Sequence, residues 1–169
     1  MATPKKDNAI DLLKKDHREV DGLFKQFEEL EDNAEAAEQV IETACTELKI
    51  HDMLEMEIFY PAVRQAAEQE EIEDLLDEAE VEHESVRELI AKLEGMDPSD
   101  GKRHAHFTVL SEYVKHHVKE EEKEMFPKVR KLKSLDLKAL GAEMKARKEA
   151  LMAEMGIEVA AEEEQDETA

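Results

Sequence analysis

Apolar residues recur at every third or fourth position through most of the chain, as they do on the buried face of an amphipathic helix. In the N-terminal part, Leu13, Val20, Phe24 and Phe27 fall on one such stripe. The same spacing predicts helical stretches at about residues 7–30, 34–69, 72–93, 102–132 and 134–155.

Three features mark where these helices end or change course. Asn33 separates the first two stretches, and Gly95 with the turn-forming segment 97–101 ends the third. Pro61 is expected to bend or tighten the late turns of the second stretch, because proline cannot continue the helical hydrogen bonding. Since the links are short, the four long helices are predicted to form an all-α, up-down-up-down four-helix bundle.

The C-terminal part is predicted to add two features to this bundle, which itself takes up residues 1–133. Ser134 is the expected N-cap of an amphipathic accessory helix over residues 134–155, packed on the outside of the bundle or on another subunit. Residues 156–169 contain six acidic residues and no basic one, so we expect a solvated, disordered acidic tail.

The composition is that of a helical and strongly acidic protein. Charged residues make up 40% of the chain, with only 5 Gly and 4 Pro. The net charge of −22 argues against binding to nucleic acid or to an anionic membrane, since both would repel such a surface.

The distribution of apolar residues and cysteine predicts a cytoplasmic protein. No run of about 18 apolar residues exists that could cross a membrane, and no apolar segment typical of a secretory signal follows residues 1–6. The single cysteine, Cys45, excludes a disulfide framework and cysteine-based metal sites, and is expected to be a small buried hydrophobe.

Two halves of the chain repeat the same pattern of metal-binding side chains. His17, His51 and Glu55 recur 66 residues later as His83, His117 and Glu121. The same shift carries the pair Tyr60-Pro61 onto Phe126-Pro127. Residues 1–133 are therefore predicted to contain two diverged repeats of about 66 residues, whose strictest matches are four histidines and two carboxylates.

This pattern predicts a centre with two metal ions. Residues four apart lie on the same face of a helix, so each His-x-x-x-Glu motif presents an imidazole and a carboxylate together. The second and fourth helices run in the same direction, and each further histidine precedes its motif by 34 residues, which brings all the donors to a similar depth. Four imidazoles and two carboxylates suit two iron ions, each held by two histidines and bridged by both glutamates and an oxo or hydroxo group.

A purely structural interpretation of these residues is the alternative. A single His-x-x-x-Glu often forms a pair on a solvated helix face, and a lone core histidine is usually satisfied by its neighbours. All six residues fall on inward stripes, however, and unpaired they would cost several kcal/mol per charged group. Metal binding is therefore the favoured hypothesis.

The other polar candidates are weaker. His104 and His106 are expected at the surface or at a helix start, and His116 at the edge of the core. Tyr113 and Glu47 occupy equivalent positions, each one turn before a candidate ligand histidine. The ordinary interpretation is packing for Tyr113 and a solvated charge for Glu47. The alternative for both is a hydrogen bond to an imidazole or to a bound ligand.

These residues resemble the hemerythrin-like, or HHE cation-binding, family over about residues 9–131. The matching motifs are Asp16-His17, His51-x-x-x-Glu55, Glu82-His83-Glu84 and His117-x-x-x-Glu121. The resemblance implies a non-haem di-iron centre in a four-helix bundle that reacts with or senses dioxygen, nitric oxide or hydrogen peroxide, or that handles iron.

Two departures from the family narrow this expectation. Oxygen-carrying members have a fifth histidine one turn from the helix-three histidine, where this chain has Ala79 and Arg87, which disfavours oxygen carriage. Iron–sulfur repair members carry an N-terminal cysteine, and residues 1–10 contain none.

Three classes of function remain open: a module that binds or senses a small gas, an enzyme that consumes peroxide or nitric oxide, and an iron-storage or purely structural metal protein. Tyr113 or Glu47 pointing into the pocket would favour an enzyme, and a dry apolar pocket would favour gas binding. Without metal, we expect the two carboxylates to take up protons or the bundle to loosen locally. Glu57 and Glu122 are expected to be less directly aimed at the site, and the sequence does not give the oligomeric state.

Overall fold

The computed structural model describes residues 8–30 and 32–156, which are helical and contain no strand. The α-helices are α1 (Ala9–Glu29), α2 (Ala34–Leu54), α3 (Tyr60–Ala66), α4 (Glu70–Gly95), α5 (Arg103–Glu120), α6 (Phe126–Val129) and α7 (Leu137–Glu154). Two π-helical turns, η1 (Glu55–Phe59) and η2 (Glu121–Met125), join α2 to α3 and α5 to α6.

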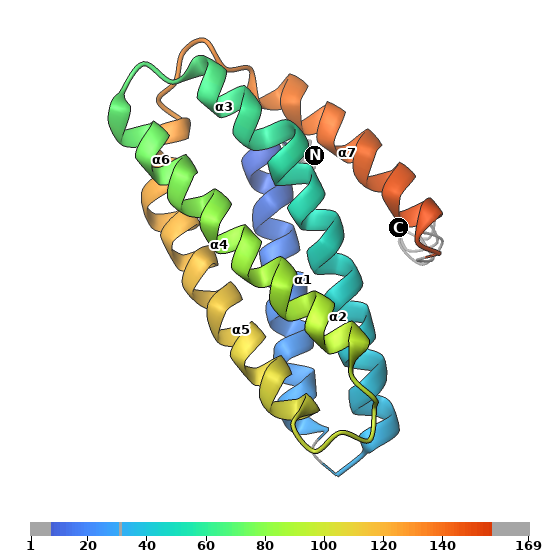
Figure 1. Ribbon diagram of the computed structural model, residues 1–169. Helices are drawn as coiled ribbons and strands as arrows, with labels where there is room; N and C mark the ends of the chain where they lie inside the picture. Colours follow the sequence, from blue (N-terminus) through green and yellow to red (C-terminus); the bar gives the residue numbers. More distant parts are fainter. Residues whose placement is uncertain (1–7, 31, 157–169) are drawn as a thin grey trace.

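These elements build the predicted four-helix bundle (Figure 1). Its long members are α1, the continuous α2-η1-α3 segment, α4, and the continuous α5-η2-α6 segment. Asparagine side chains fix the first two starting points: Asn8 accepts a hydrogen bond from the backbone of Asp11 at 2.9 Å, and Asn33 accepts one from Ala36 at 3.1 Å.

The backbone before Pro61, which was expected to bend or tighten the late turns, is widened into a π-helical turn and not tightened, and the same widening precedes Pro127. Pro61 and Pro127 stand at the start of α3 and α6, directly after the π-helical turns. Because proline has no N–H to donate, the preceding backbone closes with wider bonds, such as the one from Tyr60 to the carbonyl of Glu55. Glu55 and Glu121 each begin one of these turns, so the widened backbone sits where the predicted carboxylate ligands project.

The apolar core is divided into two clusters by a polar layer. One cluster, around Leu13, Phe59 and Phe126, lies toward the Pro-containing ends, and the other, around Phe24 and Phe107, lies toward the opposite end of the bundle. His17 lies on α1 between Leu13 of the first cluster and Val20 of the second. The predicted ligands therefore occupy a layer between two apolar regions.

Helix α7, which corresponds to the expected accessory helix, packs on the outside of the bundle. This is one of the two arrangements that the sequence predicted. Its buried residues Leu140, Met144 and Leu151 join the first core cluster. It begins later than expected: Asp136, not Ser134, caps it by accepting a hydrogen bond from the backbone of Ala139 at 3.0 Å. Nearly all of the predicted acidic tail, from residue 157 onward, lies outside the described residues.

None of the helices within residues 8–30 and 32–156 combines the length and the apolar character needed to cross a lipid bilayer.

Candidate metal centre

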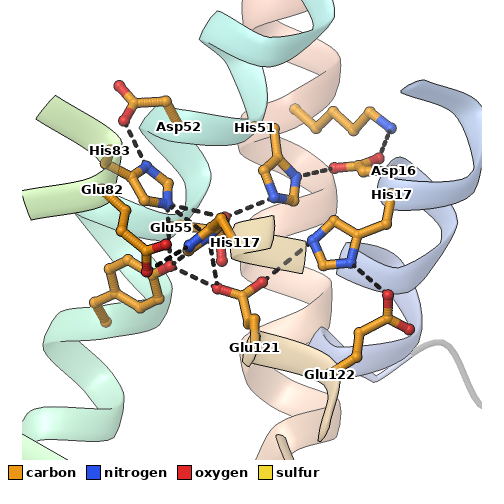
Figure 2. A network of polar contacts seen from close by, with 12 residues as sticks. Asp16, His17, His51, Asp52, Glu55, Glu82, His83, His117, Glu121 and Glu122 are labelled. Carbon is orange, nitrogen blue, oxygen red and sulfur yellow. Dashed lines mark hydrogen bonds and ion pairs between the residues drawn. The ribbon is translucent and has the colours of Figure 1, made fainter. Parts of the chain in front are cut away.

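The six predicted ligands meet in the polar layer between the two core clusters (Figure 2). All are buried, with exposed fractions of 0% to 8%. Their donor atoms form two groups that share both glutamates: His17 and His51 with Glu55 and Glu121, and His83 and His117 with the same two carboxylates. We call these the first and the second metal position.

Both glutamates reach ring nitrogens of both positions, which is the arrangement of two bridging carboxylates. Their oxygens lie close to the Nε2 atoms of the histidines: Glu55 Oε1 is 2.6 Å from His51 and 3.4 Å from His83, and Glu121 is 3.2 Å from His17 through Oε1 and 3.2 Å from His117 through Oε2.

A second set of carboxylates orients the histidines from behind. Each Nδ1 atom faces one acidic side chain: His17 faces Glu122 at 3.1 Å, His51 faces Asp16 at 3.0 Å, His83 faces Asp52 at 2.7 Å, and His117 faces Glu82 at 3.4 Å. Because an ionised carboxylate can only accept, each Nδ1 carries the proton and donates it. The Nε2 atoms, aimed at the centre, are thereby left as the metal-binding nitrogens.

Sequence reasoning did not find these four carboxylates, although the chain carries a signal for two of them. Asp16 and Glu82 obey the same 66-residue shift as the ligands, each directly before a ligand histidine. The other two break the repeat, since Asp52 corresponds to Val118 and Glu122 to Met56. Glu122, which was expected to be less directly aimed at the site than Glu55 and Glu121, lies outside the two donor groups but accepts from Nδ1 of His17.

Tyr60 is a further polar residue that the sequence did not assign to the site. Its hydroxyl donates to Glu121 Oε2 at 2.6 Å and lies 3.0 Å from His83 Nε2 and 3.4 Å from His117 Nε2, at the second metal position. Its repeat equivalent, Phe126, stacks on His17 with ring centroids 6.0 Å apart and has no oxygen to offer. The two positions therefore differ by one hydroxyl. The sequence contained a sign of this difference, because the repeat aligns Tyr60-Pro61 with Phe126-Pro127.

The other candidates lie away from the centre. Tyr113 is 50% exposed, and the side chain of His116 is 65% exposed and pairs with Glu120 at 3.3 Å, so His116 is at the surface and not at the edge of the core. His104 is exposed and packs against the ring of Phe27, as expected for a surface residue.

Cys45 behaves as the predicted buried hydrophobe. It is 4% exposed, and burial raises the pKa of its thiol to about 11. Met53 and Met56 pack against the first core cluster, as gap-filling residues do.

The metal-free centre is held together by charge. Burial alone would lower the pKa of the imidazoles, but the carboxylates around them outweigh it: the pKa of His51 lies well above its usual value, that of His83 is raised, and that of His117 is raised to about 10. Burial and mutual repulsion would raise the pKa of Glu55 and Glu121, but the histidines lower both.

Protons therefore reside on the imidazoles, and the expectation that the glutamates take them up is wrong. The physical reason is that each glutamate has histidines within 2.6 to 3.4 Å, which stabilise the ionised carboxylate more than burial destabilises it.

The residues present fit metal cations. Five buried atoms have no hydrogen-bonding partner within the described residues apart from other groups of the centre: Nε2 of His17 and His51, both carboxylate oxygens of Glu55, and Oε1 of Glu121. Buried polar atoms need partners, and these five all belong to the two groups of donors. A cation in each group would satisfy them.

A small apolar cavity adjoins the four histidines. Its volume is about 30 Å³, room for one or two water-sized molecules. Besides the histidines and the carboxylates of Asp16 and Asp52, its wall is aliphatic and consists of Val20, Leu48, Val86, Val114 and Val118. Neither Tyr113 nor Glu47 is among the lining residues.

The bundle and its buried histidine–carboxylate centre define a helical cation-binding domain, and comparisons with known proteins agree. The family model described as Hemerythrin HHE cation binding domain matches residues 8–129 and 81–165. The chain therefore belongs to the hemerythrin HHE cation-binding family.

A solved structure of the same family supports this assignment. It is the crystal structure of a hemerythrin HHE cation binding domain-containing protein from Mycobacterium kansasii, with a TM-score of 0.73 and 28% identity over 87% of this chain and 88% of that chain. A comparison with curated proteins found no match.

The pKa directions predict how the stability of the metal-free protein changes with pH. His51, His83 and His117, whose pKa is raised, contribute stability that is complete below the ordinary histidine pKa of 6.5 and is lost as the pH rises, for His117 toward a pKa of about 10. The glutamates contribute stability that is complete above 4.5 and is lost at more acidic pH.

The metal-free protein should thus be most stable between about pH 4.5 and 6.5. The melting temperature of the loaded protein should exceed that of the metal-free protein by a gap that grows from pH 6.5 to 9, as protons leave the nitrogens. Thermal melts of both forms measure this, and a gap that shrinks over that range would contradict the assignment.

The carboxylates behind the histidines should matter for affinity. Glu122→Gln should weaken metal binding by about tenfold, since outer partners of ligand histidines typically contribute ten- to a hundredfold. Glu124→Gln is the matched control, because Glu124 lies in the same π-helical turn but is exposed. Competition with a metal chelator measures both, and equal losses would show that only net charge matters.

Proposed function

We propose that the chain holds two iron ions and binds a small diatomic or peroxide ligand at them. The observation that carries this proposal is the pair of four-donor groups that share Glu55 and Glu121. A single ion in either group would leave two of the six buried donor residues, both histidines, unused. Sharing of both glutamates supports two ions held side by side.

The donor set favours iron over the other common metals. Each position offers two imidazole nitrogens and carboxylate oxygens, with no thiolate, a mixture typical of non-haem iron. When bound, such a pair supplies redox-active metal positions that can accept a small ligand.

The cavity supports a ligand of diatomic or peroxide size. With a volume of about 30 Å³, it excludes organic substrates and phosphate esters. Its aliphatic wall is more suited to dioxygen or nitric oxide than to an ion, because the described wall offers few polar partners apart from the centre's own residues. Binding or sensing of a gas is therefore the better supported use, and turnover of peroxide or nitric oxide is the enzymatic variant.

A route from solvent to this cavity lies between α1 and α5. A more open hollow of about 280 Å³ is lined by Arg18, Lys115 and Glu122 among others. Its lining shares His17, Val20, Val114 and Val118 with that of the small cavity, so the two spaces adjoin at these side chains. Val118 is the repeat equivalent of Asp52, and it places a short apolar side chain between them.

Tyr60 is proposed as a further oxygen donor at the second position. Its hydroxyl is within 3.4 Å of donor atoms of Glu121, His83 and His117, which is close enough to share a cation with them. Arg87, which stands one turn after His83 where oxygen carriers have a histidine, binds Asp52 instead and cannot serve as a ligand.

A purely structural role for the metal is less well supported. A centre that only held the helices together would not need the small apolar cavity that adjoins its four histidines. Iron storage remains the alternative within the same site. With a net charge of −22, no nucleic acid or membrane partner is proposed, and a cytoplasmic location is retained as a proposal.

The test is anaerobic reconstitution with ferrous iron, followed by separate addition of nitric oxide, dioxygen and peroxide. We expect about two iron ions per chain, a large loss of iron in His51→Ala and His117→Ala, and a spectral response to a small ligand. One ion per chain would rule out the shared centre.

The cavity has its own variant within this experiment. Val118→Phe should keep the iron but slow or abolish ligand binding, whereas Val81→Phe, at a position 63% exposed on α4, should change neither. Unaltered ligand kinetics in the Val118 variant would show that the ligand does not use this cavity or this wall.

The role of Tyr60 predicts a colour. Phenolate bound to ferric iron gives an intense visible charge-transfer band, so the oxidised wild-type protein should show one and Tyr60→Phe should lose it while keeping its iron. Phe126→Tyr is the informative counterpart, since it offers a hydroxyl beside His17 at the first position. An identical visible spectrum for wild type and Tyr60→Phe would remove Tyr60 from the ligand set.

A further inference from the structure

One side chain of α7 reaches a carboxylate of the metal centre. Lys148 Nζ lies 2.6 Å from Asp16 Oδ1, and the other oxygen of the same carboxylate, Oδ2, lies 3.0 Å from His51 Nδ1. Asp16 is 6% exposed, and the side chain of Lys148 is 22% exposed. A continuous chain of contacts thus joins an external helix to a ligand of the first metal position.

The corresponding contact at the second position stays within the bundle. Arg87 NH1 lies 2.9 Å from Asp52 Oδ1, which is 2.7 Å from His83 Nδ1. Arg87 and His83 belong to α4 and Asp52 to α2, both long members of the bundle, so no side chain of α7 takes part in this chain of contacts. The two positions are therefore connected differently to the rest of the molecule.

Docking of α7 does not depend on Lys148 alone. Met144 is fully buried and Leu151 is 2% exposed, both within the first core cluster. Arg147, the neighbour of Lys148, lies 3.6 Å from Glu57 in η1, an exposed pair that adds little. Apolar contacts hold the helix, and Lys148 is placed to transmit its presence to Asp16.

We propose that docking of α7 and occupation of the first metal position stabilise each other through Lys148, Asp16 and His51. Lys148 fixes Asp16, and Asp16 holds the Nδ1 proton of His51, which directs Nε2 at the cation. Conversely, a cation on Nε2 makes the Nδ1–H group a stronger donor to Asp16 and so reinforces the carboxylate that Lys148 binds. Lys148 is thus a positioning residue and α7 a reporter of metal loading; the inference rests on the proposed metal binding.

Reciprocity gives the first test, which uses the whole chain. If α7 favours the metal, the metal must favour docked α7 by the same free energy. We expect ferrous iron, added anaerobically, to slow hydrogen exchange in the backbone of α7 in the wild type. The same slowing should be lost in Lys148→Met, which keeps an apolar stem of similar length, and retained in Lys145→Met, one turn earlier and exposed.

Stepwise iron titration against a chelator gives the second test. Lys148→Met should weaken one of the two binding steps by about tenfold, the lower end of what outer partners contribute. Arg87→Met should weaken the other step and leave the response of α7 intact. Leu151→Ala, which loosens α7 through its apolar contact, should weaken the same step as Lys148→Met. This second variant keeps the proposal testable even if Lys148→Met undocks the helix.

The outcomes separate the two proposals. If the wild type binds no iron, the proposed function fails. If it binds two ions but α7 exchanges at the same rate with and without them, the coupling is wrong and the metal centre stands. Equal iron affinities for wild type, Lys148→Met and Leu151→Ala would also overturn the coupling.

Discussion

The structure depends on burying ionisable side chains in the middle of a helical bundle without leaving their charges uncompensated. Each of the four histidines has an acidic partner at Nδ1 and a shared glutamate near Nε2. Without these partners, burial would drive the histidines to their neutral form and the glutamates to their protonated form. With them, the layer lies between two apolar clusters, and the Nε2 atoms of all four histidines face the shared glutamates.

Duplication makes this arrangement easy to build, and departures from it give the centre its character. Two repeats bring identical ligand sets to the same depth, with both glutamates at the start of a π-helical turn before a proline. Several departures break the exact symmetry around the two donor groups. Tyr60 carries a hydroxyl where Phe126 has none, and Val118 is apolar where its equivalent, Asp52, offers a carboxylate to His83. Among the described residues, a lysine from α7 reaches Asp16, beside the first position. Two chemically similar positions thus acquire different surroundings.

Those differences connect the centre to the outside in two directions. On the side of α1 and α5, the solvent-facing hollow and the cavity beside the histidines share His17 and three valines in their linings. On the side of α7, an ion pair joins an external helix to Asp16. A small ligand would use the first connection, and the folded state of α7 would use the second. A bundle of four helices alone would lack both α7 and its contact with Asp16.

The sequence by itself indicated the helical bundle and the six candidate ligands that meet at the centre, because helix periodicity is local and the 66-residue shift singles out residues that packing alone would not repeat. It also located α7, although Asp136 and not Ser134 begins it, since several nearby polar residues can cap a helix. Only the tertiary structure decided which carboxylate serves which histidine, where Tyr60 points and what Lys148 reaches. These contacts depend on the relative height and rotation of neighbouring helices. Glu122, which contacts His17, lies one turn after Val118, the repeat equivalent of Asp52. Lys148 contacts Asp16 across 132 residues of sequence. Such heights are set by packing of whole helices, which no local pattern encodes.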